Sequence, residues 1–172
     1  MEKDVMQTVA ELMALAARTA PKAAGQDFIV QKIVTGEDLN TLADAMLKYG
    51  EQSGKKNFDR DGENVRHSDA VLLIGLNNPK NVGLNCGACG YERCADLSAH
   101  EGPEFMGPIC AWRLMDLGIA LGSAAKTASL LNADNRIMYR VGVVARQLGW
   151  IDGYVVAGIP IVAAGKSIYF DR

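Results

Sequence analysis

The chain has 172 residues, of which 49% are hydrophobic and 6% are aromatic, and its formal net charge at pH 7 is -2. This length suits a single domain, residues 1–172, with enough apolar side chains for a buried core and too many for a disordered chain. The near-neutral charge and the few aromatic residues exclude a typical nucleic-acid binder, which needs cations for phosphates and rings for bases.

The sequence has no segment typical of a membrane protein or a secretory signal peptide. Residues 117–125 and 154–165 are the longest uncharged apolar stretches, and both are shorter than the roughly 20 residues that span a bilayer. Residues 1–4 include two acidic side chains, unlike the basic start of a signal peptide. We therefore expect a cytoplasmic protein, in which cysteines are metal ligands or redox groups rather than disulfides.

The first half of the chain alternates helical and strand patterns. Apolar residues at helical spacing predict a helix over residues 3–19, and a β-branched run predicts a strand over residues 28–34. A second helix opens at residues 35–38, and the polar residues 53–66 that follow it are interpreted as a loop. Residues 70–76 form a continuous apolar run, which is typical of a strand buried on both faces.

The second half contains the longest helical pattern, over residues 111–131. A further amphipathic helix follows and ends before Gly149, which suits the position after a helix. Residues 154–159 predict a strand that Pro160 interrupts, since proline lacks the N–H that a strand ladder uses. We expect residues 161–164 to continue this strand only as an edge.

Helices mixed with few strands predict an α+β fold, in which helices pack on a small central β-sheet. Residues 77–111 interrupt the pattern, because they have little helical or strand periodicity. This segment contains all four cysteines of the chain, together with four glycines and two prolines after Cys86. We interpret it as a cysteine-rich, cluster-binding insertion within the single domain.

The spacing of the cysteines points to an iron–sulfur cluster. Cys86, Cys89 and Cys94 are separated by two and four residues, and Cys110 follows after fifteen more. A [4Fe–4S] cluster needs four thiolates at the corners of a cube, three usually from one tight loop and the fourth from elsewhere. The glycines that follow the first two cysteines allow a backbone turn with positive φ and bring N–H groups toward the sulfurs.

Other uses of four cysteines remain open from spacing alone. A structural zinc site also takes four cysteines, but usually as two CxxC pairs, and Cys94 and Cys110 form no such second pair. A thioredoxin-like redox CxxC would leave those same two residues unexplained. Unpaired buried cysteines are the remaining alternative, which the clustering makes the weakest.

The run CGxCGxxxC resembles the 4Fe–4S domain of corrinoid iron–sulfur proteins and of the B subunit of Rnf-type electron-transport complexes. That domain has a Cys-x2-Cys-x4-Cys loop and a fourth cysteine some sixteen residues later. The resemblance implies that Cys86, Cys89, Cys94 and Cys110 are the four cluster ligands. It covers about 25 residues and strengthens the iron–sulfur interpretation over the zinc one.

The whole chain is similar to a family of small uncharacterised prokaryotic proteins described only as containing a ferredoxin domain. The similarity rests on the cysteine segment, on Phe-Asp-Arg-Asp at residues 58–61, and on the terminal Gly-Ile-Pro and Gly-Lys-Ser-Ile-Tyr-Phe-Asp-Arg sequences at residues 158–160 and 165–172. This resemblance implies a cofactor, but it implies no reaction.

The order of elements also resembles the flavin-dependent nitroreductase fold: a helix, a basic turn, a helix, a central strand and then a long helix. In that fold, basic residues after the first helix hold the phosphate of FMN, and Arg18 and Lys22 occupy a comparable place. The usual dense arginine pattern is missing, and the chain is short for that family. FMN is thus a second cofactor that the resemblance implies.

We expect a one-electron carrier or redox module that holds one [4Fe–4S] cluster. The scaffold exceeds what a small ferredoxin needs, so it would also form a homodimer, dock a redox partner protein or hold a second cofactor. Residues 92–104 carry a local charge of -3 and suit either a solvated loop or a docking surface for a basic partner. The alternatives are an FMN-dependent oxidoreductase fed by the cluster and a zinc-stabilised binding module.

Overall fold

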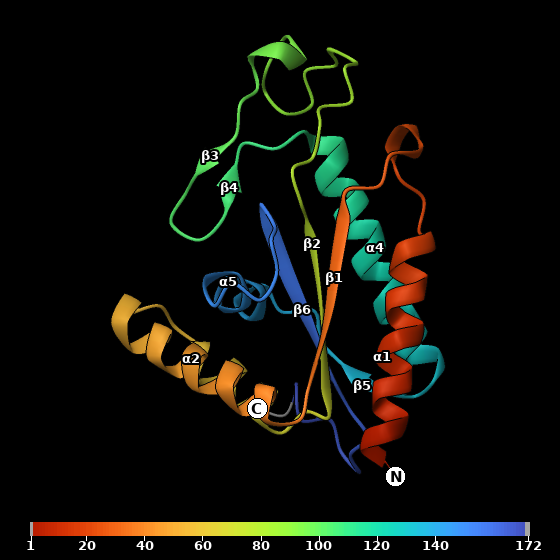
Figure 1. The fold of residues 1–172 in the computed structure, drawn as a ribbon, viewed down its shortest axis with the longest axis vertical. Helices are drawn as coiled ribbons and strands as arrows, with labels where there is room; N and C mark the ends of the chain where they lie inside the picture. The colour runs from red at the N-terminus through yellow and green to blue at the C-terminus, as the bar shows by residue number, and fades with distance from the viewer. Residues whose placement is uncertain (1, 171–172) are drawn as a thin grey trace.

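A four-stranded antiparallel sheet between two layers of helices forms the body of the molecule in this computed structural model, which describes residues 2–170 (Figure 1). The helices are α1 (Glu2–Thr19), α2 (Glu37–Ser53), α3 (Phe58–Arg66), α4 (Ala111–Leu130) and α5 (Tyr139–Gln147), with short 3-10 turns η1 (Ala23–Gly25) and η2 (Cys94–Asp96). The strands are β1 (Ile29–Thr35), β2 (Ala70–Leu76), β3 (His100–Glu101), β4 (Met106–Gly107), β5 (Asp134–Asn135) and β6 (Val155–Val162). The predicted α+β class is confirmed. No helix among residues 2–170 is both long and apolar enough to cross a membrane.

Strand β2 is the buried centre of the sheet, whose order is β1-β2-β6-β5 with antiparallel neighbours throughout. All seven residues of β2 are buried. Successive side chains of a strand point to opposite faces, so Leu72 and Ile74 pack under α1 and α4 while Val71 and Leu73 pack on the other side. The predicted strand buried on both faces is thereby confirmed.

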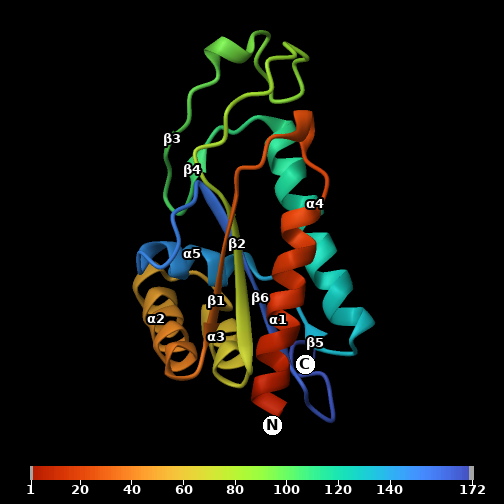
Figure 2. The ribbon, with the colours of Figure 1, turned by 45° about the vertical axis from the view of Figure 1, so that its right-hand side comes forward.

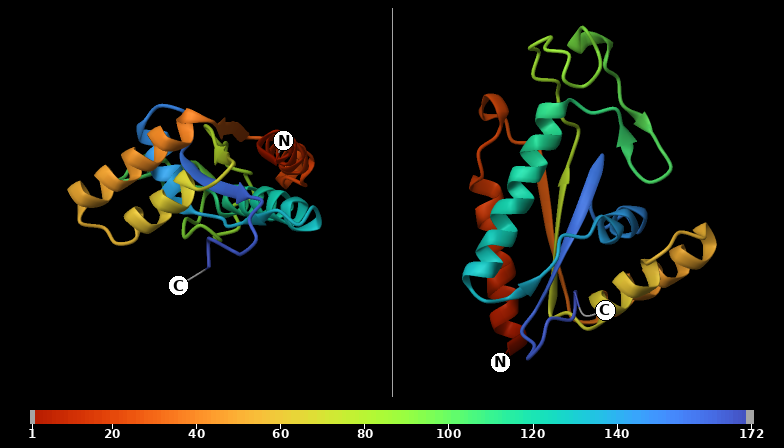
Figure 3. Two further views of the ribbon diagram at one scale, coloured as in Figure 1. Left: turned by 90° about the horizontal axis from the view of Figure 1, so that it is seen from below. Right: turned by 180° about the vertical axis from the view of Figure 1, so that it is seen from behind.

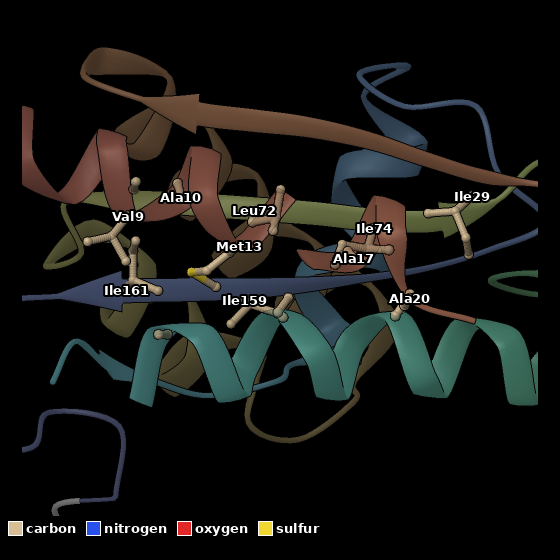
Figure 4. Close-up of a cluster of buried hydrophobic side chains, with 14 of the residues drawn as sticks. Val9, Ala10, Met13, Ala17, Ala20, Ile29, Leu72, Ile74, Ile159 and Ile161 are labelled. Carbon is tan, nitrogen blue, oxygen red and sulfur yellow. The ribbon is translucent and has the colours of Figure 1, made fainter. Parts of the chain in front are cut away.

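Helices cover both faces of the sheet. Helices α1 and α4 run side by side along one face, whereas α2, α3 and α5 cover the other (Figures 2 and 3). Met13 of α1 lies among Leu72 and Ile159 of the central strands in Figure 4. Helix α4 adds small buried residues such as Ala120 and Ala124, which let it lie close to α1. Burying each large aliphatic side chain contributes about 1.5–3 kcal/mol.

The interpretation of residues 53–66 as a loop is wrong over its second part, which forms α3. Phe58 and Val65 are fully buried on one side of this short helix, and most of its other positions are polar. Gly62 lies so close to α2 that a Cβ there would press on the side chain of Leu47. Packing against α2 stabilises the helix, and the polar sequence alone does not reveal that contact.

Strand β6 continues through Pro160, contrary to the expectation that this proline interrupts the strand. Gly158 exchanges both of its backbone hydrogen bonds with Met138, on the side away from β2. Residues two apart in a strand direct their backbone groups to the same side, so Pro160 also directs its nitrogen away from β2. The missing N–H therefore costs the β2–β6 ladder nothing, and β6 lies inside the sheet rather than at its edge.

Alanine substitution of two glycines, one on α5 and one on α4 as a control, tests the packing of α5 on the sheet. A Cβ at Gly142 would overlap the backbone carbonyl of Val156, so Gly142→Ala should lower the free energy of unfolding by about 1–3 kcal/mol. Gly118→Ala is the matched control, because nothing lies within 4 Å of its Cβ position on α4. Alanine there should raise the free energy of unfolding by about 0.5–1 kcal/mol. Denaturant unfolding followed by circular dichroism measures both, and equal stabilities would contradict this packing.

Candidate metal centre

The insertion predicted over residues 77–111 ends one residue earlier in the structure, because Ala111 begins α4. This cysteine segment, residues 77–110, leaves the sheet at the end of β2 and leads into the start of α4. It forms one end of the molecule, at the top of Figure 1, beyond the ends of the central strands. Its regular elements are limited to η2 and the two-residue strands β3 and β4. The scaffold thus holds both ends of the segment at the same end of the sheet.

All four cysteines line one pocket at the junction of this segment with α4. Cys86 is exposed, Cys89 and Cys94 are half-buried, and Cys110 is buried as the N-cap residue of α4. The other lining residues are mostly apolar and comprise Val82, Leu84, Gly87, Ala88, Tyr91, Ala111 and Trp112. Within residues 2–170, no three His, Cys, Asp or Glu side chains are grouped so that they could hold a single metal ion.

N–H groups are directed at the sulfur atoms of two cysteines. The indole Nε1 of Trp112 donates to Sγ of Cys86 at 3.3 Å, and the backbone N–H of Asn85 donates to Sγ of Cys94 at 3.3 Å. A hydrogen bond from the backbone of Ala88, together with that from Trp112, lowers the pKa of the Cys86 thiol. Because these donors stabilise the deprotonated sulfur, they favour the thiolate form of Cys86.

The turns of the loop depend on glycines, as expected from the sequence. Gly87 and Gly90 have φ values of 74° and 87°, a region that other residues rarely adopt. Asn81 fastens the far side of the loop, because its Nδ2 donates to the carbonyl oxygens of Cys94 at 2.7 Å and of Leu97 at 3.3 Å. The loop around the pocket is therefore tied to the chain that leaves β2.

Arg113 joins the start of α4 to two other segments. Its side chain is 0% exposed and pairs with that of Asp116, which is 6% exposed, at 3.1 Å. The guanidinium also donates to the carbonyl oxygens of Lys80 at 2.8 Å and Ala23 at 2.9 Å, and to Oε1 of Gln26 at 2.5 Å. These bonds connect the first turn of α4 to the cysteine segment and to η1, so they position the residues beside Cys110.

The hairpin of β3 and β4 ties the cysteine segment to the opposite helix layer. Arg146 of α5 makes two hydrogen bonds to the carboxylate of Glu101, at 2.6 and 2.7 Å, and thereby lowers the pKa of that carboxyl. Lys55 lies 2.6 Å from Glu104 in the hairpin loop. The segment is thus anchored on both of its sides.

These ion pairs also bear on the two interpretations of residues 92–104. A third carboxylate of the segment, that of Asp96, lies 2.8 Å from Arg93. Three of its four carboxylates, Asp96 and the two in the hairpin, are therefore paired with cations of the chain. Paired charges attract a basic partner weakly, so this geometry favours a solvated loop over an acidic docking surface.

Comparison with known sequences identifies relatives of the chain. An uncharacterized protein of Archaeoglobus fulgidus is 49% identical over 169 residues, which cover 97% of this chain and 91% of that one. The sequence model of a family described as "uncharacterized protein containing a ferredoxin domain" matches residues 106–172. The chain belongs to this ferredoxin-domain family. The matched residues include Cys110 and begin after the other three cysteines.

Solved structures with a similar fold include nitroreductases. Nitroreductase CinD from Lactococcus lactis has a TM-score of 0.61 at 14% identity, with 93% of this chain and 79% of that one covered. A putative nitroreductase in complex with FMN from Desulfovibrio desulfuricans has a TM-score of 0.60 at 11% identity, with 96% and 78% covered. This member of the ferredoxin-domain family therefore has a nitroreductase-like fold, as the order of its elements indicates.

The two cations compared with flavin-binding residues are engaged within the chain itself. Arg18 lies 2.6 Å from Asp27 and donates to the carbonyl oxygen of Ile29 at 2.8 Å. Nζ of Lys22 donates to three carbonyl oxygens at the end of α1, at 2.6, 2.7 and 3.2 Å. Both side chains therefore have structural roles here, and this geometry does not support them as ligands of a flavin phosphate.

Sequence reasoning missed three residues of the site: Asn85, Trp112 and Arg113. Arg113 and Asp116 are a charged pair three residues apart within a mostly apolar helix, which is the signal that could have identified them. Trp112 is one of two tryptophans in the chain and lies two residues from a candidate ligand. Asn85 acts partly through its backbone, which leaves no such signal.

Two arginine–aspartate pairs, each with its partners three residues apart, test how burial changes the contribution of an ion pair to stability. Arg113→Met should lower the free energy of unfolding by about 3–5 kcal/mol, because it leaves Asp116 buried without its cation. Arg93→Met removes the equivalent exposed pair with Asp96 and should cost about 0–1 kcal/mol. Urea titration of both variants measures the difference, and similar losses would refute the anchoring role of Arg113.

Proposed function

We propose that the chain binds one [4Fe–4S] cluster through Cys86, Cys89, Cys94 and Cys110 and acts as a one-electron carrier. The observation that carries this proposal is that all four cysteines line one pocket. A [4Fe–4S] cluster takes one thiolate at each corner of its cube, so its ligands surround a cavity rather than a single point. Membership of a family with a ferredoxin domain supports the same class of cofactor.

The four ligands differ in exposure, and this difference suits electron exchange. The cluster, when bound, supplies a site for one electron. Buried Cys110 belongs to the scaffold side of the pocket, whereas exposed Cys86 belongs to the solvent side. The chain itself fixes the thiolates, donates N–H groups to them and lines the pocket with apolar side chains. We expect a redox partner protein to approach the side on which Cys86 is exposed.

The N-terminus of α4 adds favourable electrostatics. Cys110 is the N-cap residue of this 20-residue helix, so its sulfur lies beside the positive end of the helix dipole. Four thiolates in one pocket repel one another, and a fixed positive potential lowers the cost of holding them together. This contribution comes from the backbone and does not depend on any basic side chain.

The cofactor that the protein contains distinguishes two alternative functions from that of an electron carrier. An FMN-dependent oxidoreductase fed by the cluster is supported by the fold, because a nitroreductase from Desulfovibrio desulfuricans with that fold contains FMN. The engagement of Arg18 and Lys22 within the chain counts against it. A zinc-stabilised binding module is supported only by the four thiols, which zinc also binds.

The decisive experiment is anaerobic purification followed by reconstitution with ferrous iron and sulfide. The proposal predicts iron and acid-labile sulfide in equal amounts, a broad visible absorbance that dithionite bleaches, and an EPR signal of the reduced cluster. Zinc without iron or sulfide would overturn the proposal in favour of the binding module. A resolved flavin absorbance with released FMN would support the oxidoreductase.

Cys89→Ala tests the ligand assignment. This substitution removes one corner ligand, so a stable four-iron cluster should no longer form and the ratio of iron to protein after reconstitution should fall. His100→Ala is the control, because His100 is an exposed residue of β3 outside the lining of the pocket, and its iron content should be unchanged. An unaltered ratio of iron to protein in the Cys89 variant would refute the assignment.

A further inference from the structure

The indole of Trp112 has a position from which it can tune the centre. Trp112 is the second residue of α4, lines the cysteine pocket and donates from Nε1 to Sγ of Cys86 at 3.3 Å. We propose that this hydrogen bond raises the reduction potential of the centre. The inference rests on the proposed function, because it requires Cys86 to be a cluster ligand.

The direction of the effect follows from charge. Reduction adds one electron, and hence one negative charge, to the thiolate-bound cluster, while no covalent bond forms or breaks. Hydrogen bonds to charged acceptors are stronger than those to neutral ones, so an N–H donor stabilises the more negative, reduced state more. Hydrogen bonds to the sulfurs are among the factors that set cluster potentials. Loss of the indole donor should therefore make reduction less favourable.

The indole is a fixed donor because of the residue that follows it. Arg113 is fully buried and bonds to Lys80 and Asp116, which holds the first turn of α4 in one place. Cys86 is the most exposed of the four cysteines, and the indole adds a side-chain donor there to the backbone hydrogen bond from Ala88. A preoriented indole N–H stabilises charge there without the cost of ordering a donor on reduction.

Trp112 is also the donor that mutation can remove cleanly. Among the described residues, it is the only one whose side chain donates to a cysteine sulfur. The other hydrogen bonds to cysteine sulfurs, from Asn85 to Cys94 and from Ala88 to Cys86, come from the backbone and survive side-chain substitution. Replacing the indole therefore tests one hydrogen bond while the backbone of the loop is left unchanged.

The test is a redox titration of the reconstituted Trp112→Phe protein. Phenylalanine keeps an aromatic ring at this site but has no N–H. At a potential where the unaltered protein is half reduced, the ratio of reduced to oxidised cluster should fall about tenfold, equivalent to about 59 mV for one electron. Trp150→Phe is the matched control, because Trp150 packs against the core on the side of the sheet that α2, α3 and α5 cover, and it does not line the pocket. Its potential should equal that of the unaltered protein.

Fluorescence supplies a second readout that needs no titration. The chain has two tryptophans, so Trp112 is the only one left in the Trp150→Phe protein. Its emission should be strongly quenched when the cluster is reconstituted, because the indole lies against a cluster ligand. This measurement uses the Trp150→Phe protein, so it can be made even if Trp112→Phe takes up too little iron for titration.

The outcomes separate the two proposals. An unchanged potential in an iron-replete Trp112→Phe protein would overturn the role of Trp112 and leave the cluster proposal intact. Trp112 emission that cluster loading does not alter would overturn the same inference. Failure of the unaltered protein to take up iron and sulfide would instead overturn the proposed function.

Discussion

The guanidinium of Arg113 connects three parts of the chain at the end of the molecule where the cysteines lie. It bonds to the turn after α1, to the first residues of the cysteine segment, and to Asp116 on its own helix. Burying such a charge costs several kcal/mol unless its donors are paired, and no buried side-chain nitrogen or oxygen among residues 2–170 lacks a partner. A shift of any one segment would leave this charge unsatisfied, so their relative positions are strongly restrained.

The first turn of α4 brings the requirements of the fold and of the site together. Within four residues it contains Cys110 at the edge of the pocket, Trp112 on the sulfur of Cys86, and Arg113 in the core. The rest of the helix is held along α1 by small buried residues over the central strands. A site on a packed helix is positioned more accurately than one on loops alone, and this helix supplies that precision to an otherwise irregular segment.

Elements whose own spacing of apolar residues indicates which side chains are buried could be predicted from the sequence. The apolar run of β2 and the long periodicity of α4 belong to this class, and the spacing of the cysteines groups residues that the structure brings to one pocket. Features that depend on distant partners could not be predicted. Helix α3 forms because Gly62 fits against α2. Pro160 is tolerated because its nitrogen faces away from β2. Arg113 can be buried because its guanidinium bonds to carbonyl oxygens 33 and 90 residues away in the sequence.

The distribution of the four cysteines has a mechanical consequence. Three lie on one irregular loop, and the fourth begins a helix whose position the core determines. A group bound to all four would act as a covalent cross-link between the loop and the scaffold, closing a ring of 25 residues from Cys86 to Cys110. Ordering of the loop and retention of the group would then be one linked equilibrium, so that whatever strengthens either strengthens both.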